Sequence, residues 1–217
     1  MKAFIFDLNG TMVHDMDYHT KAWQHIFNHD LGGNFTWDEV KPQMYGKNAE
    51  VLERVFGAER FTAEEVQQLS LAKEARYQDE FRPHLRLLPG LAEFLAAAHA
   101  RGIALAIGSA AIPFNIDFVV DGLELRSYFP TIVSADDVTL SKPHPETFLK
   151  AAELLGVAPA DCLVFEDVPK GVEAAARAGM AAVVLTTTHP ATDFAGLANV
   201  QHFAPDFTDD FFQTLLS

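Results

Sequence analysis

Side chains that can bind a metal or a phosphate follow short apolar runs in this sequence. They are Asp7, Asn9, Thr11, Ser109, Lys142, Glu166 and Asp167. If these runs are parallel strands of one sheet, their carboxyl ends meet at one edge, where ligands bind in open α/β sheets. Two carboxylates, such as Asp7 and Asp167, suit a hard divalent cation such as Mg²⁺. A lysine and a hydroxyl group can bind phosphate oxygens.

The combination predicts phosphoryl transfer. Asp7 is a weak nucleophile, but it can attack phosphorus once a cation and Lys142 neutralise the transferring group, giving an aspartyl-phosphate. Each residue alone has an ordinary structural explanation. An Asp after a strand is often a helix cap or a turn residue, and Lys142 could simply be solvated. The prediction therefore rests on the convergence of all these residues at one edge.

The elements that must position these residues alternate between strand and helix. Strands are expected at residues 2–6, 103–107, 131–133, 162–165 and 182–185, all apolar on both alternations as in strands covered on both faces. Helical stretches lie between them and end at Gly102, Gly156 and Gly179. This alternation predicts an α/β fold with a doubly wound, parallel, Rossmann-like sheet.

One segment interrupts the alternation. Residues 15–83 contain no convincing strand, and three of their stretches have the periodicity of amphipathic helices. We therefore expect a core formed by residues 1–14 and 84–217, with a helical cap domain inserted at 15–83. Such an insert would act as a lid or as a rigid support.

Composition limits the classes of partner. Of the 217 residues, 30 are acidic and 16 are Lys or Arg, and the net charge of −14 disfavours nucleic acid and anionic membranes as partners. The single cysteine, Cys162, excludes a disulfide framework. The sequence shows neither a signal-peptide pattern nor an apolar run of the roughly 20 residues that a membrane span needs. We expect a cytoplasmic, monomeric protein.

The motifs resemble those of the haloacid dehalogenase superfamily. The matching stretches are Asp-Leu-Asn-Gly-Thr at 7–11, Gly-Ser-Ala at 108–110, Ser-Lys-Pro-His-Pro-Glu at 141–146 and Phe-Glu-Asp-Val-Pro-Lys-Gly at 165–171. Their order and wide spacing also match, over essentially the whole chain. The branch with the greatest resemblance is that of β-phosphoglucomutase and related small-molecule phosphatases.

The resemblance implies a Mg²⁺-dependent phosphohydrolase whose substrate is a small phosphorylated metabolite, such as a sugar phosphate. It makes Asp7 the nucleophile and a metal ligand. Asp167, Glu166 and the backbone carbonyl of Asn9 would be further ligands. The residues expected to bind phosphate or substrate are Ser109, Ala110, Lys142, Thr11 and, from the cap, Lys47.

Asn9 departs from the family pattern, in which this position is a second Asp that acts as general acid and base. A carboxamide does not titrate in the useful range, so proton transfer is expected to be impaired or supplied by another group. His19, at the beginning of the cap, is the leading candidate because an unperturbed histidine titrates near neutrality. The expected catalytic set is thus Asp7, Asn9, Lys142, Ser109 and His19.

Three alternatives stay open. A phosphosugar mutase of the β-phosphoglucomutase type is the first, although Ala49 stands where a cap arginine is expected and residues 109–115 lack an expected polar stretch. A non-catalytic phosphate-binding protein is the second. A phosphoryl-receiver signalling module is the third, and the insert of about 70 residues argues against it.

Overall fold

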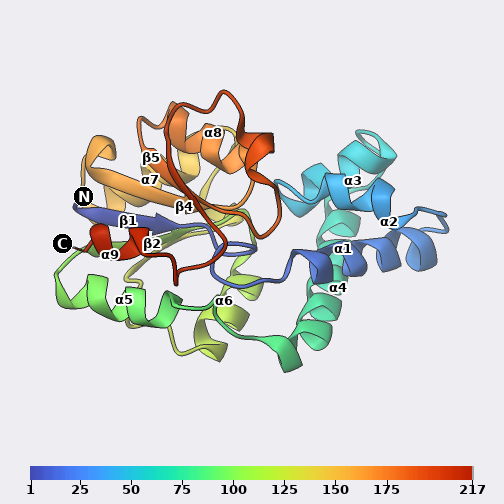
Figure 1. The fold of residues 1–217 in the computed structure, drawn as a ribbon. Coiled ribbons are helices and arrows are strands. Elements are labelled where there is room, and N and C mark those ends of the chain that lie inside the picture. Colours follow the sequence, from blue (N-terminus) through green and yellow to red (C-terminus); the bar gives the residue numbers. More distant parts are fainter. Residues whose placement is uncertain (217) are drawn as a thin grey trace. The chain divides into compact units, whose positions relative to one another are not determined.

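A computed structural model describes residues 1–216 of the chain (Figure 1). The chain divides into two compact units. One, the core unit, consists of Met1–His14 and the residues from Arg86 onward, and the other, the helical unit, is Asp15–Leu85. Each unit has its own hydrophobic core, and each is described by itself.

The core unit is built on a six-stranded sheet. Its strands are β1 (Ala3–Phe6), β2 (Ala104–Gly108), β3 (Thr131–Val133), β4 (Cys162–Glu166), β5 (Ala181–Leu185) and β6 (Val200–Ala204). They lie in the order β3-β2-β1-β4-β5-β6, and all neighbouring pairs are parallel. The strand order therefore reverses between β1 and β4, and a ligand is expected beyond their carboxyl ends.

Helices cover both faces of this sheet. On one face of the sheet lie α7 (Glu146–Leu155) and α8 (Pro169–Arg177) (Figure 1). Their buried side chains belong to a largely aliphatic core. On the other, Phe94 of α5 (Leu91–Ala100) stacks with Phe4 and meets the edge of Phe165. The remaining helices of the core unit are α6 (Pro113–Gly122) and α9 (Phe211–Thr214). The central strands β1, β2 and β4 are apolar up to Glu166, the last residue of β4, because both of their faces are buried.

The fold class predicted from the sequence is confirmed by this sheet. Five strands lie within one residue of their predicted bounds, but β6 is absent from the prediction. Its sequence, Val-Gln-His-Phe-Ala, alternates partly exposed and exposed residues up to the buried Ala204. A strand at a sheet edge with an open face does not need the continuous apolar run that marks a central strand.

The helical unit contains α1 (Met16–His25), α2 (Trp37–Val40), α3 (Asn48–Phe56) and α4 (Ala63–Phe81), and α1 continues into a π-helical turn at Ile26–Asp30. Residues 15–85 are all described and contain no strand. Trp23, Phe27 and Leu52 are buried in the core of the unit. The longest helix, α4, begins with a capping box in which Thr62 and Glu65 satisfy each other's backbone N–H groups.

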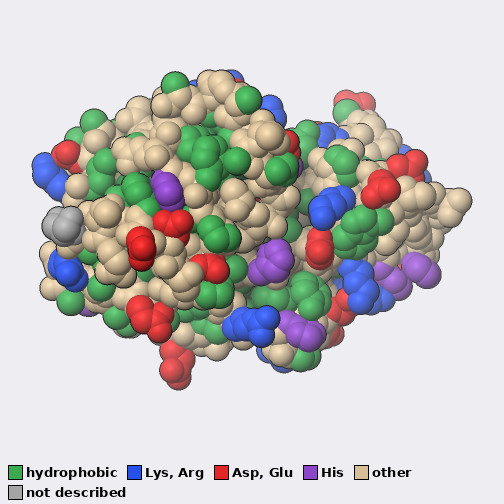
Figure 2. All heavy atoms as spheres, in the orientation of Figure 1, with side chains coloured by type: hydrophobic (Ala, Val, Ile, Leu, Met, Phe, Trp, Pro, Cys, Tyr) green, Lys and Arg blue, Asp and Glu red, His purple; other side chains and the backbone are tan. Residues whose placement is uncertain are grey.

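No helix within residues 1–216 is long and apolar enough to cross a bilayer. On the face drawn in Figure 2, charged side chains lie scattered among uncharged ones.

Candidate active site

Three buried carboxylates meet at the carboxyl ends of β1 and β4. The backbone N–H of Asp7 donates to the carbonyl of Phe165 at 2.9 Å, which places Asp7 beside Glu166, the last residue of β4. Asp167 follows directly. One oxygen from each of the three carboxylates lies within 4.8 Å of the other two. The sheet thus brings together the acids that the sequence predicts at this edge.

Lys142 is the cation within this cluster. Its Nζ lies 2.5 Å from Asp7 Oδ1 and 2.7 Å from Glu166 Oε1, and its side chain is buried. Burial alone would lower the pKa of Lys142, but the charges and hydrogen bonds of the two carboxylates outweigh burial and raise it. Lys142 therefore places a permanent positive charge against the candidate nucleophile.

Asp167 is the third acid of the cluster, and the two hydrogen bonds of Lys142 go to the other two acids. Burial, together with the charges of Glu166 and Asp7, raises its pKa well above the ordinary value. Its Oδ1 accepts a hydrogen bond from the Thr11 hydroxyl at 3.0 Å, whereas its Oδ2 is buried without a hydrogen-bond partner. Three carboxylates and one lysine leave an excess of negative charge that a hard divalent cation fits. No other group of His, Cys, Asp or Glu within residues 1–216 is close enough to hold a metal with three ligands.

The turn after β1 is closed by backbone hydrogen bonds. The N–H of Met12 donates to the Leu8 carbonyl and that of Gly10 to the Val13 carbonyl, both at 2.9 Å. Gly10 has φ of +80°, and a Cβ there would lie 2.1 Å from Asp167 Oδ2. Only glycine suits this position, because it tolerates the left-handed conformation and the close carboxylate. Asn9, one residue earlier, is partly exposed.

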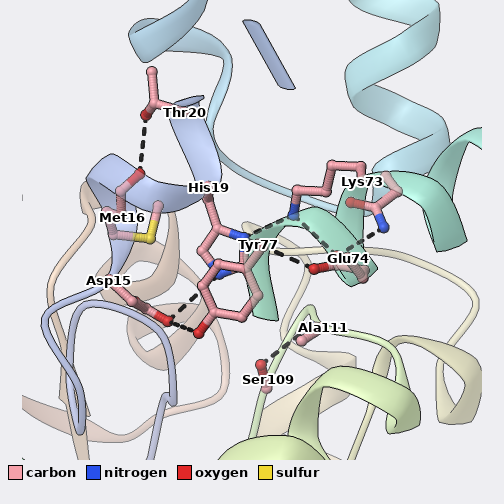
Figure 3. Close-up of polar contacts among 10 residues, drawn as sticks. Asp15, Met16, His19, Thr20, Lys73, Glu74, Tyr77, Ser109 and Ala111 are labelled. Carbon is pink, nitrogen blue, oxygen red and sulfur yellow. Dashed lines mark hydrogen bonds and ion pairs between the residues drawn. The ribbon is translucent and has the colours of Figure 1, made fainter. Parts of the chain in front are cut away.

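Ser109 and Ala110 follow β2, the other neighbour of β1. Phe6 pairs with Ile107, so Asp7 continues beside Gly108 and Ser109 comes one residue later. Ser109 is buried, its N–H donates to the Val133 carbonyl at 2.9 Å, and its Oγ accepts the Ala111 N–H at 3.1 Å (Figure 3). The hydroxyl predicted to bind phosphate thus lies just beyond the end of β2, the strand next to β1, and Asp7, the candidate nucleophile, lies just beyond the end of β1.

Thr187 and Thr188, in the loop after β5, also lie at this edge of the sheet, although the sequence did not lead us to expect them there. The Thr187 hydroxyl donates to the Gly10 carbonyl across 177 residues of sequence. Thr188 Oγ1 lies 2.9 Å from the position a Gly10 Cβ would occupy, on the same side as Asp167 Oδ2. The available signal was the Thr-Thr-Thr run directly after the strand predicted at 182–185. Thr11, in the turn after β1, also reaches this edge, because its hydroxyl donates a hydrogen bond to Asp167.

The other two predicted residues, His19 and Lys47, belong to the helical unit. The Lys47 N–H donates to Glu50 at the start of α3. His19 lies on α1 in a buried polar network with two residues of α4, Lys73 and Tyr77 (Figure 3). Its Nδ1 is 2.7 Å from Lys73 Nζ, and its ring stacks on Tyr77 with centroids 3.8 Å apart.

Both nitrogens of the His19 ring have partners in this network. Lys73 can only donate, so Nδ1 accepts and the ring proton lies on Nε2, which is 3.4 Å from Asp15 Oδ2. Lys73 also donates to Glu74 at 2.9 Å, and the Tyr77 hydroxyl donates to Asp15 at 2.6 Å. Burial would raise the pKa of Glu74, but the charges of its neighbours lower it overall. The network holds the imidazole in one tautomer and does not present it as a free base.

The strand order and the helical insert after β1 define a Rossmann-like α/β protein, with a cluster of buried acids at the point of strand reversal. The model of haloacid dehalogenase-like hydrolases matches residues 1–179. The chain belongs to this family, and the resemblance seen in its motifs is confirmed.

Two bacterial enzymes are among the relatives of this chain. The β-phosphoglucomutase of Bacillus subtilis is 34% identical over 194 residues, which cover 84% of this chain and 82% of the relative. The fructose-1-phosphate phosphatase YqaB of Escherichia coli is 32% identical over 192 residues, which cover 83% and 94%. These relatives support an enzyme of the phosphatase type.

Solved structures agree on the fold. A mutant of CbbY from Rhodobacter sphaeroides in complex with xylulose-1,5-bisphosphate superposes with a TM-score of 0.83 at 24% identity, over 96% of both chains.

Proposed function

We propose that the protein is a Mg²⁺-dependent phosphohydrolase that acts on a small phosphorylated metabolite through an aspartyl-phosphate on Asp7. The observation that carries the proposal is the buried edge where Lys142 contacts Asp7 at 2.5 Å beside the unpartnered Oδ2 of Asp167. The relatives named for β-phosphoglucomutase and fructose-1-phosphate phosphatase favour a sugar phosphate as the substrate.

The carboxylates of Asp7 and Asp167 and the backbone carbonyl of Asn9 would hold the Mg²⁺ ion. When bound, the ion supplies positive charge that offsets the negative charge of the phosphoryl group. Two features support an ion here: the acids of the site outnumber its cation, and one buried carboxylate oxygen has no hydrogen-bond partner.

In the first step, a carboxylate oxygen of Asp7 forms a bond to phosphorus while the bond from phosphorus to the leaving oxygen breaks. Lys142 and Ser109 bind the non-bridging oxygens and stabilise the charge that develops there. The departing alkoxide needs a proton, and the water that later cleaves the aspartyl-phosphate must lose one. Asn9 performs neither transfer, because its side chain does not titrate.

A panel of phosphorylated metabolites tests this function. Each compound would be incubated with Mg²⁺ and with the chain as it stands, Asn9→Asp or Asp7→Ala, and released phosphate would be measured. We expect weak release by the unaltered chain, stronger release by Asn9→Asp, and none by Asp7→Ala. Undiminished release by Asp7→Ala would rule out the proposed nucleophile.

His19 is the candidate for the missing proton transfer, and this role requires its hydrogen bond to Lys73 or Asp15 to open. If His19 replaces the acid and base, His19→Gln lowers the steady rate for an alkyl phosphate and changes its pH profile. Asn9→Asp would then restore the rate in the double variant.

Lys47 is proposed to bind the substrate, so Lys47→Ala should raise KM with little change in kcat.

Two other functions have an observation in their favour. The 34% identity with a β-phosphoglucomutase favours a phosphosugar mutase. Formation of glucose 6-phosphate from β-glucose 1-phosphate, measured with a coupled dehydrogenase, tests it. Asn9 favours a protein that binds phosphate without turnover. Calorimetric binding of a panel compound with no phosphate release over hours would support that alternative.

A further inference from the structure

Glu166 differs from the other two acids of the cluster because the protein itself uses its carboxylate. Oε1 accepts a hydrogen bond from Lys142 Nζ at 2.7 Å. Oε2 accepts the backbone N–H groups of Asp167 at 2.9 Å and Val168 at 3.0 Å. A carboxylate oxygen has about two acceptor positions, so Oε2 is filled and Oε1 has one position left. The side chain is fully buried.

Gly171 covers the carboxylate on the side of α8. A Cβ built on Gly171 would lie 1.7 Å from Glu166 Oε1 and 2.5 Å from Oε2. The carboxylate therefore lies directly against the α-carbon of residue 171, so any side chain larger than hydrogen at this position would displace the carboxylate. Together, the helix and the three hydrogen bonds leave Glu166 little room for a further ligand.

Asp167 has the opposite environment. Its Oδ2 is buried without a hydrogen-bond partner, and its pKa is raised, first by burial and then by the neighbouring acids. Such an oxygen gains most from a bound cation. Of the two adjacent acids, Glu166 thus has its oxygens engaged by protein groups, whereas Asp167 has an oxygen suited to a cation.

Building on the function proposed above, we propose that Glu166 is a positioning residue that holds Lys142 against Asp7, and that it does not bind the metal. Gly171 is the residue that makes this arrangement possible. A lysine has a long, flexible side chain, and a second fixed carboxylate confines its ammonium group to one place. Phe148, whose ring centroid is 4.7 Å from Lys142 Nζ, limits it further. This assignment removes Glu166 from the metal ligands expected from the sequence.

The test separates metal binding from phosphoryl transfer. Mn²⁺ affinity would be measured by calorimetry, and the rate of p-nitrophenol release in the first turnover by stopped flow. For Glu166→Gln we expect the Mn²⁺ Kd to stay within about threefold, because no ligand is lost. The first-turnover rate should fall by about 10- to 100-fold, as is typical when a residue that orients a functional group is replaced.

Three further variants complete the design. Asp167→Asn should weaken Mn²⁺ binding far more than Glu166→Gln does. Gly171→Ala should reproduce the effects of Glu166→Gln, with folding checked by circular dichroism. Glu173→Gln, on the partly exposed side of α8, is the matched control and should change neither quantity.

Glu166→Gln weakening Mn²⁺ binding as much as Asp167→Asn would overturn the proposal, and so would an unchanged first-turnover rate. If the unaltered chain shows no p-nitrophenol release at all, the proposed phosphohydrolase function fails. The Mn²⁺ comparison would still decide whether Glu166 is a ligand.

Discussion

At the scale of single residues, Asn9 determines how far the proposed reaction can proceed. In the proposed mechanism Asp7, Lys142 and Asp167 support attack on phosphorus, and this half of the chemistry does not need the side chain of residue 9 when the leaving group departs without a proton. The second half needs a base for the attacking water, which a carboxamide does not provide.

The time course with p-nitrophenyl phosphate should therefore have two phases. The nitrophenolate leaves without a proton, so the chain should release about one equivalent quickly and then continue slowly. Asn9→Asp should raise the slow rate by about 10²-fold or more, the usual contribution of a general acid or base. A fast, linear time course from the unaltered chain would show that another group already supplies the proton transfer.

At the scale of elements, the strands of the core unit were predictable and several partners of the site were not. Central strands are apolar on both faces, which makes β1, β2 and β4 recognisable. Asp7, Ser109 and Glu166 could be predicted because each ends or follows such a strand. Thr187 was not predicted to belong to the site, for two reasons. Its contact with Gly10 joins distant parts of the chain, and a threonine after a strand is an ordinary loop residue.

The buried polar network of the helical unit could not be predicted from the sequence, for a different reason. Lys73 and Glu74 lie in a stretch of α4 rich in charged residues, where helical periodicity predicts a solvated face. In the structure their side chains are only 4% and 3% exposed, because α1 packs against α4 at this point and pairs them with His19. Periodicity does not show which charged residues have buried partners.

This network should stabilise the helical unit. Tyr77→Phe removes the hydrogen bond to Asp15, whose carboxylate is fully buried, at an expected cost of about 1–3 kcal/mol in the free energy of unfolding. Tyr18→Phe, at a partly exposed position on α1, is the matched control and should cost less than about 0.5 kcal/mol. Urea unfolding followed by circular dichroism gives both values, and equal costs would contradict the assigned role of Tyr77.

At the scale of the whole molecule, the proposed function requires an acidic protein to accept an anionic substrate. The net charge of −14 opposes this, so Lys142 and a bound cation must reverse the field locally. Because the pKa of Asp167 is raised, the need for a bound cation depends on pH. In the metal-free protein the stability contributed by protonated Asp167 is present at low pH and is lost as pH rises through its folded-state pKa.

Stabilisation by Mg²⁺ should therefore increase with pH. In the proposed site the ion would bind ionised Asp167, so at acidic pH it would have to displace a proton, whereas at alkaline pH it would relieve the charge of an already ionised group. The difference in Tm between samples with Mg²⁺ and with EDTA should be larger at the alkaline end of a series from mildly acidic to mildly alkaline pH. Asp167→Asn should remove most of this dependence, and a Tm difference that decreases as pH rises would be inconsistent with it.

The most direct test of the account is detection of phosphate on Asp7. The chain would be mixed with p-nitrophenyl phosphate and Mg²⁺, quenched in acid within the first turnover, digested and examined by mass spectrometry. We predict one added phosphoryl group on the peptide that contains Asp7, long-lived because Asn9 slows its hydrolysis, and no such group in Asp7→Asn. Rapid p-nitrophenol release with Asp7 unmodified, or with the phosphoryl group on another residue, would contradict the central claim.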